Sequence, residues 1–256
     1  MTPTAGFIVH PIAAQIEVRI DRAMTPLPDD VEQRVETLWQ AAIRRVADGG
    51  AGQLFNGRVF SADTITPARI GGHLTEFRRI VAQMDDPSLA PILDIRPLAV
   101  CGVVLGRDGV VIGRRPTGAV YQPGMWQLPP AGSVDSHAAR PDGRIDLIGQ
   151  LATEFTEELG LPATAIRSTR PLCAVEHPGS RVTDLGIAIA TDLTADEITV
   201  AHRANGNREY DPLRVLAPDA VPGFVADAGD DLVPPAREFL ARVGLLAYGL
   251  SPPAGP

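Results

Sequence analysis

The sequence predicts a protein of the α/β class, in which an α+β extension precedes a larger α/β domain. Apolar residues recur at helical spacing in segments of both parts. Strand-like segments alternate with these helices, and two of them flank the turn GRDG, which is a hairpin signal. A boundary is expected near DDPSLAPILDIRP, residues 85–97. We therefore divide the chain into the extension (1–93), the main domain (94–248) and a flexible, proline-rich tail (249–256).

The extension is predicted to contain both strands and helices. QIEVRI (15–20) alternates apolar and polar residues, as a half-buried strand does. DDVEQRVETLWQAAIRRVAD (29–48) begins with aspartates suited to capping and carries apolar residues at helical spacing, so we expect an amphipathic helix. GGAG (49–52) would end it, an extended segment (58–66) would follow, and HLTEFRRIVAQM (73–84) is expected to form a shorter helix.

The main domain begins with the predicted hairpin. A loop rich in glycine and proline, PTGAVYQPGMWQLPPAG, then leads through a polar segment to an acidic helix. The strand candidates are LAVCGVVL, VVIGRR, PLCAVEH, DLGIAIATDL and REYDPLRVL. An amphipathic helix, PPAREFLARVGLL, is expected last.

Composition restricts the partners. The chain has 256 residues, 45% of them hydrophobic, which is ordinary for a folded globular protein. All 23 basic residues are arginines, so lysine chemistry is excluded. The net charge of −8 argues against general nucleic-acid binding, which requires a basic surface. An acidic protein still accepts a phosphorylated substrate if a divalent cation lies between them.

Hydropathy and cysteine usage favour an intracellular protein. The longest apolar run, PLAVCGVVLG, is about half of what a bilayer crossing needs, and the N-terminus lacks the pattern of a signal peptide. We therefore expect a cytoplasmic location and no membrane contact. Cys101 and Cys173 lie in apolar strand-like segments, which favours buried, reduced thiols over a disulfide.

The acidic helix, within QLATEFTEELGLP (150–162), carries the main functional signal. At 100° per residue, Glu154, Glu157 and Glu158 lie within an arc of about 100°. The apolar stripe lies on a separate face, so the carboxylates lie at the edge of the buried face. Gly160 and Pro162 are typical of a helix end.

Two interpretations of the glutamate patch remain open. Most acidic helices are simply solvated. However, like charges at this spacing cost roughly 0.2–0.5 kcal/mol per pair, and residues 145–161 contain four acids and no base. A hard divalent cation that prefers oxygen ligands would relieve the repulsion, so the patch is also a candidate metal site.

TEFTEELGL (153–161) resembles the second half of the Nudix box, G-x5-E-x7-R-E-U-x-E-E-x-G-U with U a bulky apolar residue. WQLPPAG resembles the strand and glycine loop that lead into the box, with Gly132 as its first glycine. The resemblance covers roughly 97–245. It implies a Nudix α/β/α sandwich with a mixed β-sheet, and a loop-helix-loop that binds Mg²⁺ or Mn²⁺. It also implies that Glu154, Glu157 and Glu158 are catalytic metal ligands and that the Gly132 carbonyl is a further candidate ligand.

The box departs from the family pattern in two ways. Thr153 stands where the family has an arginine, and Gly132 precedes Thr153 by 21 positions, seven more than in the pattern. The inserted run is SVDSHAARPDGR, and Ile145 stands where a glutamate is expected. Asp135 or Asp146 would be a substitute, with a solvated loop residue as the alternative. These departures leave open a Nudix fold that binds its ligand without catalysis.

A second resemblance concerns the extension. LFNGRVFSADTITPARIGGHLTEFRRIV (54–81), followed by the hairpin and GRRP, resembles the front of the UDP-sugar diphosphatase branch. Members of that branch lack the arginine of the box and hydrolyse UDP-glucose or UDP-galactose to UMP and sugar 1-phosphate. The expected activity is therefore Mg²⁺- or Mn²⁺-dependent hydrolysis of a nucleoside diphosphate sugar. An ADP-ribose diphosphatase, or a nucleotide-binding sensor, is the alternative, and a homodimer is left open.

Several side chains are candidates for substrate contacts. Arg114 and Arg115 enter the loop that faces the box, and guanidinium forks suit diphosphate oxygens, with surface solvation as the alternative. Tyr121 is a candidate for stacking on a base or ring. Glu176 and Glu209 are candidates for the further carboxylate that many Nudix enzymes supply from a later loop.

Three further residues are expected to have structural rather than functional roles. Trp126 precedes QLP and is expected to pack in the core rather than on a ligand. His137 lies in the inserted loop and His177 follows Glu176, and both are expected to be exposed or hydrogen-bonded histidines.

Overall fold

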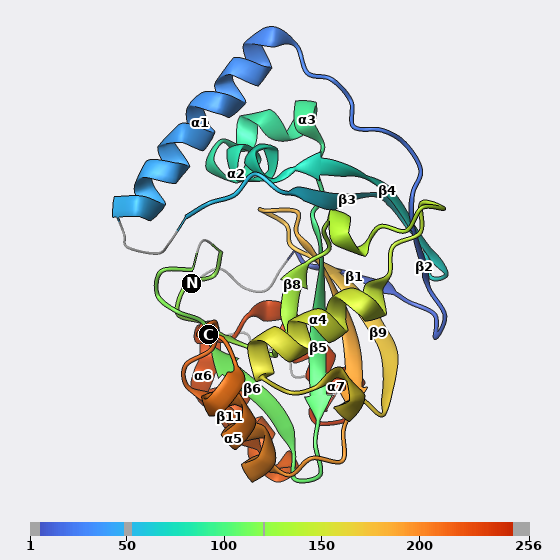
Figure 1. Ribbon diagram of the computed structural model, residues 1–256, viewed down its shortest axis with the longest axis vertical. Helices are drawn as coiled ribbons and strands as arrows, with labels where there is room; N and C mark the ends of the chain where they lie inside the picture. Colours follow the sequence, from blue (N-terminus) through green and yellow to red (C-terminus); the bar gives the residue numbers. More distant parts are fainter. Residues whose placement is uncertain (1–5, 49–52, 120, 248–256) are drawn as a thin grey trace, which may run out of the picture.

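The computed structural model describes residues 6–48, 53–119 and 121–247. These residues form a three-stranded sheet with helices α1 to α3 in the extension, and an eight-stranded sheet with helices α4 to α7 in the main domain. Figure 1 shows the extension above the main sheet, with α1 outermost and α2 beneath it. The fold therefore places one wall of the extension against one end of the main sheet.

The extension is built around α1 (Asp29–Asp48) and a small sheet in the order β2-β4-β3. Its strands are β2 (Glu17–Ile20), β3 (Arg58–Ile65) and β4 (Arg69–Glu76), and β3 and β4 are antiparallel. The helices α2 (Phe77–Asp85) and α3 (Ala90–Leu93) follow. The predicted periodicity of α1 is confirmed, because its buried residues lie on one stripe: Val31, Val35, Trp39 and Ala42.

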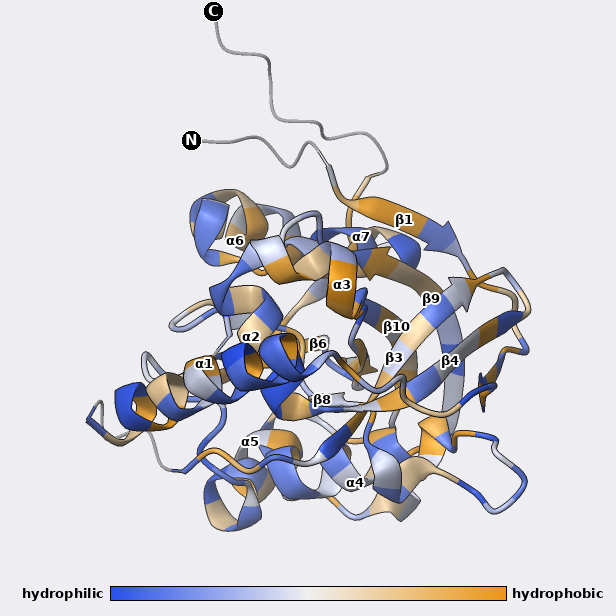
Figure 2. Cartoon of the chain, turned by 90° about the horizontal axis from the view of Figure 1, so that it is seen from above, coloured by the Kyte–Doolittle hydropathy of each residue, from blue (hydrophilic) through white to orange (hydrophobic). Residues whose placement is uncertain are grey.

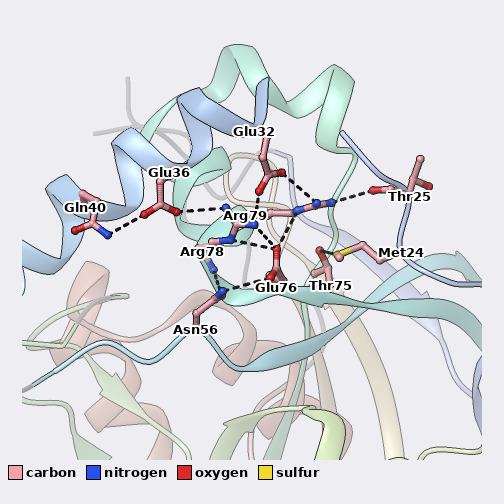
Figure 3. A network of polar contacts seen from close by, with 10 residues as sticks. All are labelled: Met24, Thr25, Glu32, Glu36, Gln40, Asn56, Thr75, Glu76, Arg78 and Arg79. Atoms are coloured by element: carbon pink, nitrogen blue, oxygen red, sulfur yellow. Dashed lines mark hydrogen bonds and ion pairs between the residues drawn. The ribbon is translucent and has the colours of Figure 1, made fainter. Parts of the chain in front are cut away.

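Charged side chains join α1 to α2 (Figure 3). Arg78 contacts three glutamates, Glu32 and Glu36 of α1 and Glu76 at the end of β4. Arg79 forms ion pairs with Glu32 (Nη2 to Oε2, 3.3 Å) and with Glu76 (Nε to Oε2, 3.5 Å). We call these five residues the arginine-glutamate network. Each of its carboxylates has at least one guanidinium partner.

The main sheet has the order β1-β9-β10-β5-β6-β11, with β7 beside β6 and β8 beside β5. It is mixed, since β10 and β5 run parallel while the other pairs are antiparallel. The strands are β1 (Ile8–Pro11), β5 (Leu98–Leu105), β6 (Val110–Arg114), β7 (Trp126–Gln127), β8 (Ala131–Ser133), β9 (Ser168–Glu176), β10 (Thr183–Ala190) and β11 (Leu213–Leu216).

Helices cover both faces of this sheet, as Figure 2 shows. α4 (Leu147–Leu159) and α5 (Ala195–Asn205) pack on one face, where Leu98, Val100 and Ile187 of the sheet are buried. α6 (Val221–Ala228) and α7 (Pro234–Arg242) pack on the other face. The predicted α/β/α sandwich with a mixed sheet, preceded by an α+β extension, is therefore confirmed.

The segment 73–84 differs from its prediction. Residues 73–76 belong to β4, and the helix begins only at Phe77. Ser61 and Phe60 of β3 pair with His73 and Leu74, so a neighbouring strand stabilises an extended backbone there. The prediction of a helix over HLTEFRRIVAQM is therefore confirmed for residues 77–84 and wrong for residues 73–76.

Three further differences concern element ends. β1 was not predicted, and it pairs with β9, so residues from the extension complete the edge of the main sheet. β11 begins at Leu213 rather than 208, directly after Pro212, which has no N–H to donate to a ladder. α7 ends at Arg242 because Gly244 has φ +80°. The division at residue 93 stays a prediction, and the predicted tail and GGAG stop lie outside the described residues.

Two smaller predictions were tested as well. Cys101 and Cys173 are free and buried, as expected of reduced core thiols. Within the ranges that the structure describes, no helix is long and apolar enough to cross a membrane.

Candidate active site

The acidic helix α4 is held in place at both ends and along one face. At its start, the Asp146 side chain accepts a hydrogen bond from Gly149 N (3.0 Å), and at its end Gly160 has φ +66°. Leu151, Phe155 and Leu159 are fully buried against the sheet. Glu154 and Glu158, one helical turn apart, then lie beside β8.

Glu158 is a buried carboxylate with a free oxygen. Its exposed fraction is 0%, and Oε2 accepts a hydrogen bond from Ala131 N (3.0 Å). Oε1 has no hydrogen-bond partner among the described residues. Burial, followed by the negative charges of Glu209 and Glu154, raises the pKa of Glu158 well above its usual range. A buried acceptor without a partner is costly, so this oxygen is suited to a ligand.

Glu154 lies against the glycine loop. A Cβ added at Gly132 would lie 2.0 Å from Glu154 Oε1, so only glycine permits this approach. The same Oε1 accepts a hydrogen bond from Gln150 Nε2 (2.8 Å). Burial raises the pKa of Glu154, the Gln150 hydrogen bond opposes the rise, and the charges of Glu209, Glu157 and Asp135 add to it.

The third predicted glutamate lies at the rim. Glu157 is exposed, and its charge contributes to the raised pKa of Glu154. Its backbone carbonyl accepts a hydrogen bond from Asn207 N (2.8 Å), which joins α4 to the loop after α5. The structure therefore brings Glu154 and Glu158 together at Gly132 and leaves Glu157 at the edge of the patch.

Of the two later carboxylates, Glu209 is at the site and Glu176 is elsewhere. Glu209 lies in the loop before β11, where Asn207 Nδ2 donates to its Oε1 (2.9 Å), and its charge raises the pKa of both Glu154 and Glu158. Glu176 forms ion pairs with His10, Arg96 and Arg181 at the end of β9.

The donor set suits a hard divalent cation, with one restriction. The unpartnered Glu158 oxygen and the mutual repulsion of these carboxylates are what such a cation would satisfy. Glu158 and Glu154 would hold it, with Glu209, Glu157 and the Gly132 carbonyl as further ligands. However, across 6–48, 53–119 and 121–247, no three His, Cys, Asp or Glu side chains are gathered closely enough to hold a metal ion.

The inserted segment supplies no direct replacement for the missing box glutamate. Ile145 is buried in the core beneath α4. Asp146 caps the helix and pairs with Arg140 (Oδ2 to Nη2, 2.9 Å), so it is a structural residue. Asp135 accepts hydrogen bonds from His137, yet its charge still raises the pKa of Glu154. Thr153, at the arginine position, donates to Gly149 O on the exposed side of α4.

A cavity of about 700 Å³ opens beside the carboxylates. This volume lies within the range of small-molecule sites. Its polar end includes Arg115, Gly132, Glu209, Tyr121 and Asp184, and its other end is lined by the extension. The cavity therefore connects the acidic helix region to the wall that α1 and α2 form.

The two predicted arginines point in different directions. Arg115 lines the cavity, where Nη1 donates to Gln127 Oε1 (2.5 Å) and the buried Nε has no hydrogen-bond partner among the residues that the structure describes. Its positive charge lowers the pKa of Glu158 relative to what burial alone would give. Arg114 instead donates from Nε to Gly124 O (2.8 Å) and lies 5.7 Å from the ring centroid of Trp126. Arg115 is placed to bind an anion, whereas Arg114 holds the loop.

Tyr121 lines the cavity and is the first residue of a series of hydrogen-bonded side chains that leads into the core. Its hydroxyl lies 2.9 Å from His177 Nδ1 and 2.9 Å from Ser180 Oγ. His177 Nε2 lies 2.7 Å from Asp184 Oδ2, and Cys101 Sγ donates to Asp184 Oδ1 (3.4 Å). Burial raises the pKa of Tyr121 to about 12, so the phenol stays neutral. His177 is therefore a hydrogen-bonded histidine, as expected, and His137 is exposed.

Sequence reasoning missed Asp184 and Cys101 as neighbours of the cavity. Both lie in apolar strands, β10 and β5, whose pairing brings them side by side, and only the polar Asp184 within an apolar run gave a signal. Trp126 packs edge-to-face on Phe224 (centroids 5.2 Å apart), which confirms its predicted role in the core.

No family model and no curated protein matches the sequence. Solved structures share distant likeness. The MutT protein from Methanosarcina mazei Go1 is 18% identical, with 58% of this chain and 92% of that chain covered and a TM-score of 0.39. DR0079 from Deinococcus radiodurans is 18% identical (51% and 73% covered, TM-score 0.35). A bifunctional NMN adenylyltransferase/ADP ribose pyrophosphatase from Francisella tularensis, complexed with AMP and a manganese ion, is 11% identical (65% and 48% covered, TM-score 0.40).

Proposed function

We propose that this chain hydrolyses the diphosphate linkage of a nucleoside diphosphate sugar, of the UDP-glucose or UDP-galactose type, with Mg²⁺ or Mn²⁺. The products would be a nucleoside monophosphate and a sugar 1-phosphate. The observation that supports this most is the buried, unpartnered oxygen of Glu158 beside Glu154, next to a cavity that Arg115 enters. The proposal also rests on the resemblance of TEFTEELGL to the Nudix box.

Each residue has a defined part in this reaction. Arg115 is unpaired at Nε and would bind a diphosphate oxygen at the polar end of the cavity. Glu154 and Glu158, with their raised pKa, would bind the cation. A bound divalent cation would polarise the phosphoryl oxygens and lower the pKa of water near them. Glu209, which lines the cavity, would accept the proton of the attacking water or serve as a further ligand of the cation.

Two alternatives remain. The first is ADP-ribose as the substrate, because no described residue at the polar end is assigned to recognise a uracil. The second is a protein that binds a nucleotide without hydrolysis. It is favoured by one observation, namely that no three potential ligand side chains converge among the described residues. In either case we propose a small-molecule ligand and neither nucleic acid nor a membrane as partner.

The test is a substrate panel with Mg²⁺ or Mn²⁺. It comprises UDP-glucose, UDP-galactose, ADP-ribose, ADP-glucose and free nucleoside diphosphates. We expect turnover of at least one sugar-linked diphosphate, with the monophosphate and sugar phosphate as products. Nucleotide binding in calorimetry without hydrolysis under either cation would refute the enzyme and favour the sensor.

A further inference from the structure

The end of the cavity away from the carboxylates has a different chemistry. Its lining from the extension is apolar apart from one amide, that of Gln53: Val46, Leu54, Phe77, Ile80, Val81 and Met84. We call these six apolar residues the apolar wall. A ligand that fills the cavity must therefore carry an anionic part and an apolar part.

The apolar wall belongs mainly to one face of α2. Phe77, Ile80, Val81 and Met84 have the spacing i, i+3, i+4 and i+7, so their side chains point the same way. Ile80 and Val81 are each 3% exposed, and the Phe77 ring packs edge-on against Trp39 (centroids 6.2 Å apart). Ile80 and Val81 therefore support the wall from the core of the extension, and the half-buried Phe77 and Met84 provide most of the surface of α2 that faces the cavity.

The arginine-glutamate network joins α2 to α1 and to the end of β4. Figure 3 shows Arg78 and Arg79 reaching from α2 to the glutamates of α1 and β4. Arg79 Nη1 also donates to Thr25 O (3.0 Å), which ties the helix to the segment before α1. The network therefore fixes α2 within the extension before any ligand binds.

The chemistry of the wall selects which part of the ligand it receives. Sugar hydroxyls placed against it would lose their water without gaining hydrogen-bond partners, which is costly. A nucleobase presents two flat, apolar faces that pack well on aliphatic and aromatic side chains. We infer that the apolar wall is the binding site for the nucleobase of a nucleoside diphosphate conjugate, an inference that rests on the proposed function.

This placement has a consequence for specificity. Bases differ in the donors and acceptors along their edges, and among the described residues of the extension that line the cavity, only Gln53 beside the wall has a polar side chain to contact an edge. The base is therefore bound through its faces. Uracil, cytosine and adenine bind with similar affinity, and selectivity arises at the other end of the ligand.

The test measures binding without a cation, by calorimetry, for UMP, CMP, AMP, glucose 1-phosphate and inorganic phosphate. Met84→Trp fills the apolar end, and it should weaken all three nucleotides roughly ten- to a hundredfold. Glucose 1-phosphate and inorganic phosphate should bind as they do to the unaltered protein. Met84→Ala, which removes packing area without adding bulk, should weaken the nucleotides by a smaller factor.

The control is Ile92→Trp. Ile92 is 52% exposed on α3 of the same extension and does not line the cavity, so this change should leave all five affinities unaltered. If Met84→Trp weakened the binding of glucose 1-phosphate and left the nucleotide affinities unaltered, the sugar would lie at the wall and the inference would be overturned. Nucleotide affinities that stay unaltered in both Met84 variants would also overturn the inference. A more than tenfold difference in affinity among UMP, CMP and AMP for the unaltered protein would overturn it as well. Nucleotide binding that follows the expected pattern, without turnover of any diphosphate, keeps the base site and refutes only the proposed hydrolysis.

Discussion

Two groups of neighbouring glutamates in this protein are differently paired. In the arginine-glutamate network, Glu32, Glu36 and Glu76 share two guanidinium groups. On α4, Glu154 and Glu158 have no ion pair among the described residues, and one oxygen of Glu158 has no partner of any kind. The comparison teaches that crowding alone does not mark a site. A cluster whose carboxylates have guanidinium partners stabilises the fold, whereas carboxylates without such partners are suited to a cationic ligand.

The largest effect should follow from removing charge on α4. If the proposed function holds, Glu158→Gln and Glu154→Gln should lower the hydrolysis rate by roughly three orders of magnitude or more, because the cation loses its main ligands. Steady-state rates of product formation measure this. Thr153→Ala is the matched control on the same helix, and it should keep nearly the full rate because its hydroxyl contacts only Gly149 O. Equal rates for all variants would refute the assignment.

Substitutions in the arginine-glutamate network should change the stability of the fold rather than the hydrolysis rate. Arg79→Met leaves Glu32 and Glu76 without one partner and should lower the free energy of unfolding by roughly 2–3 kcal/mol, less than for a fully buried pair because Glu32 is partly exposed. Urea unfolding measures this. Glu36→Gln removes a half-exposed partner of Arg78 and should change stability by less than about 1 kcal/mol. A larger loss for Glu36→Gln than for Arg79→Met would contradict the ranking.

Mg²⁺ or Mn²⁺ should stabilise the protein through α4 alone. A ligand at a hundred times its dissociation constant adds about 2.7 kcal/mol to the free energy of unfolding. The melting temperature with the cation should therefore exceed that with a chelator. Glu158→Gln should abolish the difference, whereas Arg79→Met should lower both melting temperatures and keep it. Identical melting with cation and chelator in the unaltered protein would exclude the metal site.

The last effect concerns pH in the absence of a cation. Because the pKa of Glu158 is raised in the folded state, the folded protein binds this proton more tightly than the unfolded chain does. Its contribution to stability is full below the unfolded pKa and is lost as pH rises through the folded pKa. The free energy of unfolding should fall with rising pH over that window. Glu158→Gln should flatten the profile, and an unchanged slope would contradict the raised pKa.

Local signals were enough to predict much of the fold and part of the site. α1 was predicted with its observed bounds, because capping aspartates and an apolar stripe lie within one segment. Helical spacing also predicted that the glutamates share one side of α4, but it placed them at the edge of the buried face, whereas Glu158 is fully buried. The start of β4 was wrong because pairing with β3 stabilises an extended backbone that the local pattern did not indicate.

The features that the sequence did not predict depend on contacts between segments that are far apart in the sequence. Arg114 and Arg115 are adjacent in sequence, and only the positions of Gly124 and Gln127 decide which of them enters the cavity. The chain from Tyr121 through His177 to Asp184 joins two loops and strand β10. The apolar wall looked like an ordinary helix face, since its cavity exists only once the extension meets the main domain.

The pairing of β1 with β9 also bears on how the chain reaches its folded state during synthesis. Val9 lies opposite Val175, so β1 leaves the ribosome well before its partner and must wait until β9 has followed. Such non-local pairing is slow, because the loop between the strands must close first. Until β1 arrives, β9 has β10 on one side and an open edge on the other, and an unpaired edge invites association with other chains. The closing of this edge is therefore a late event, and nascent chains are most vulnerable to aggregation just before it.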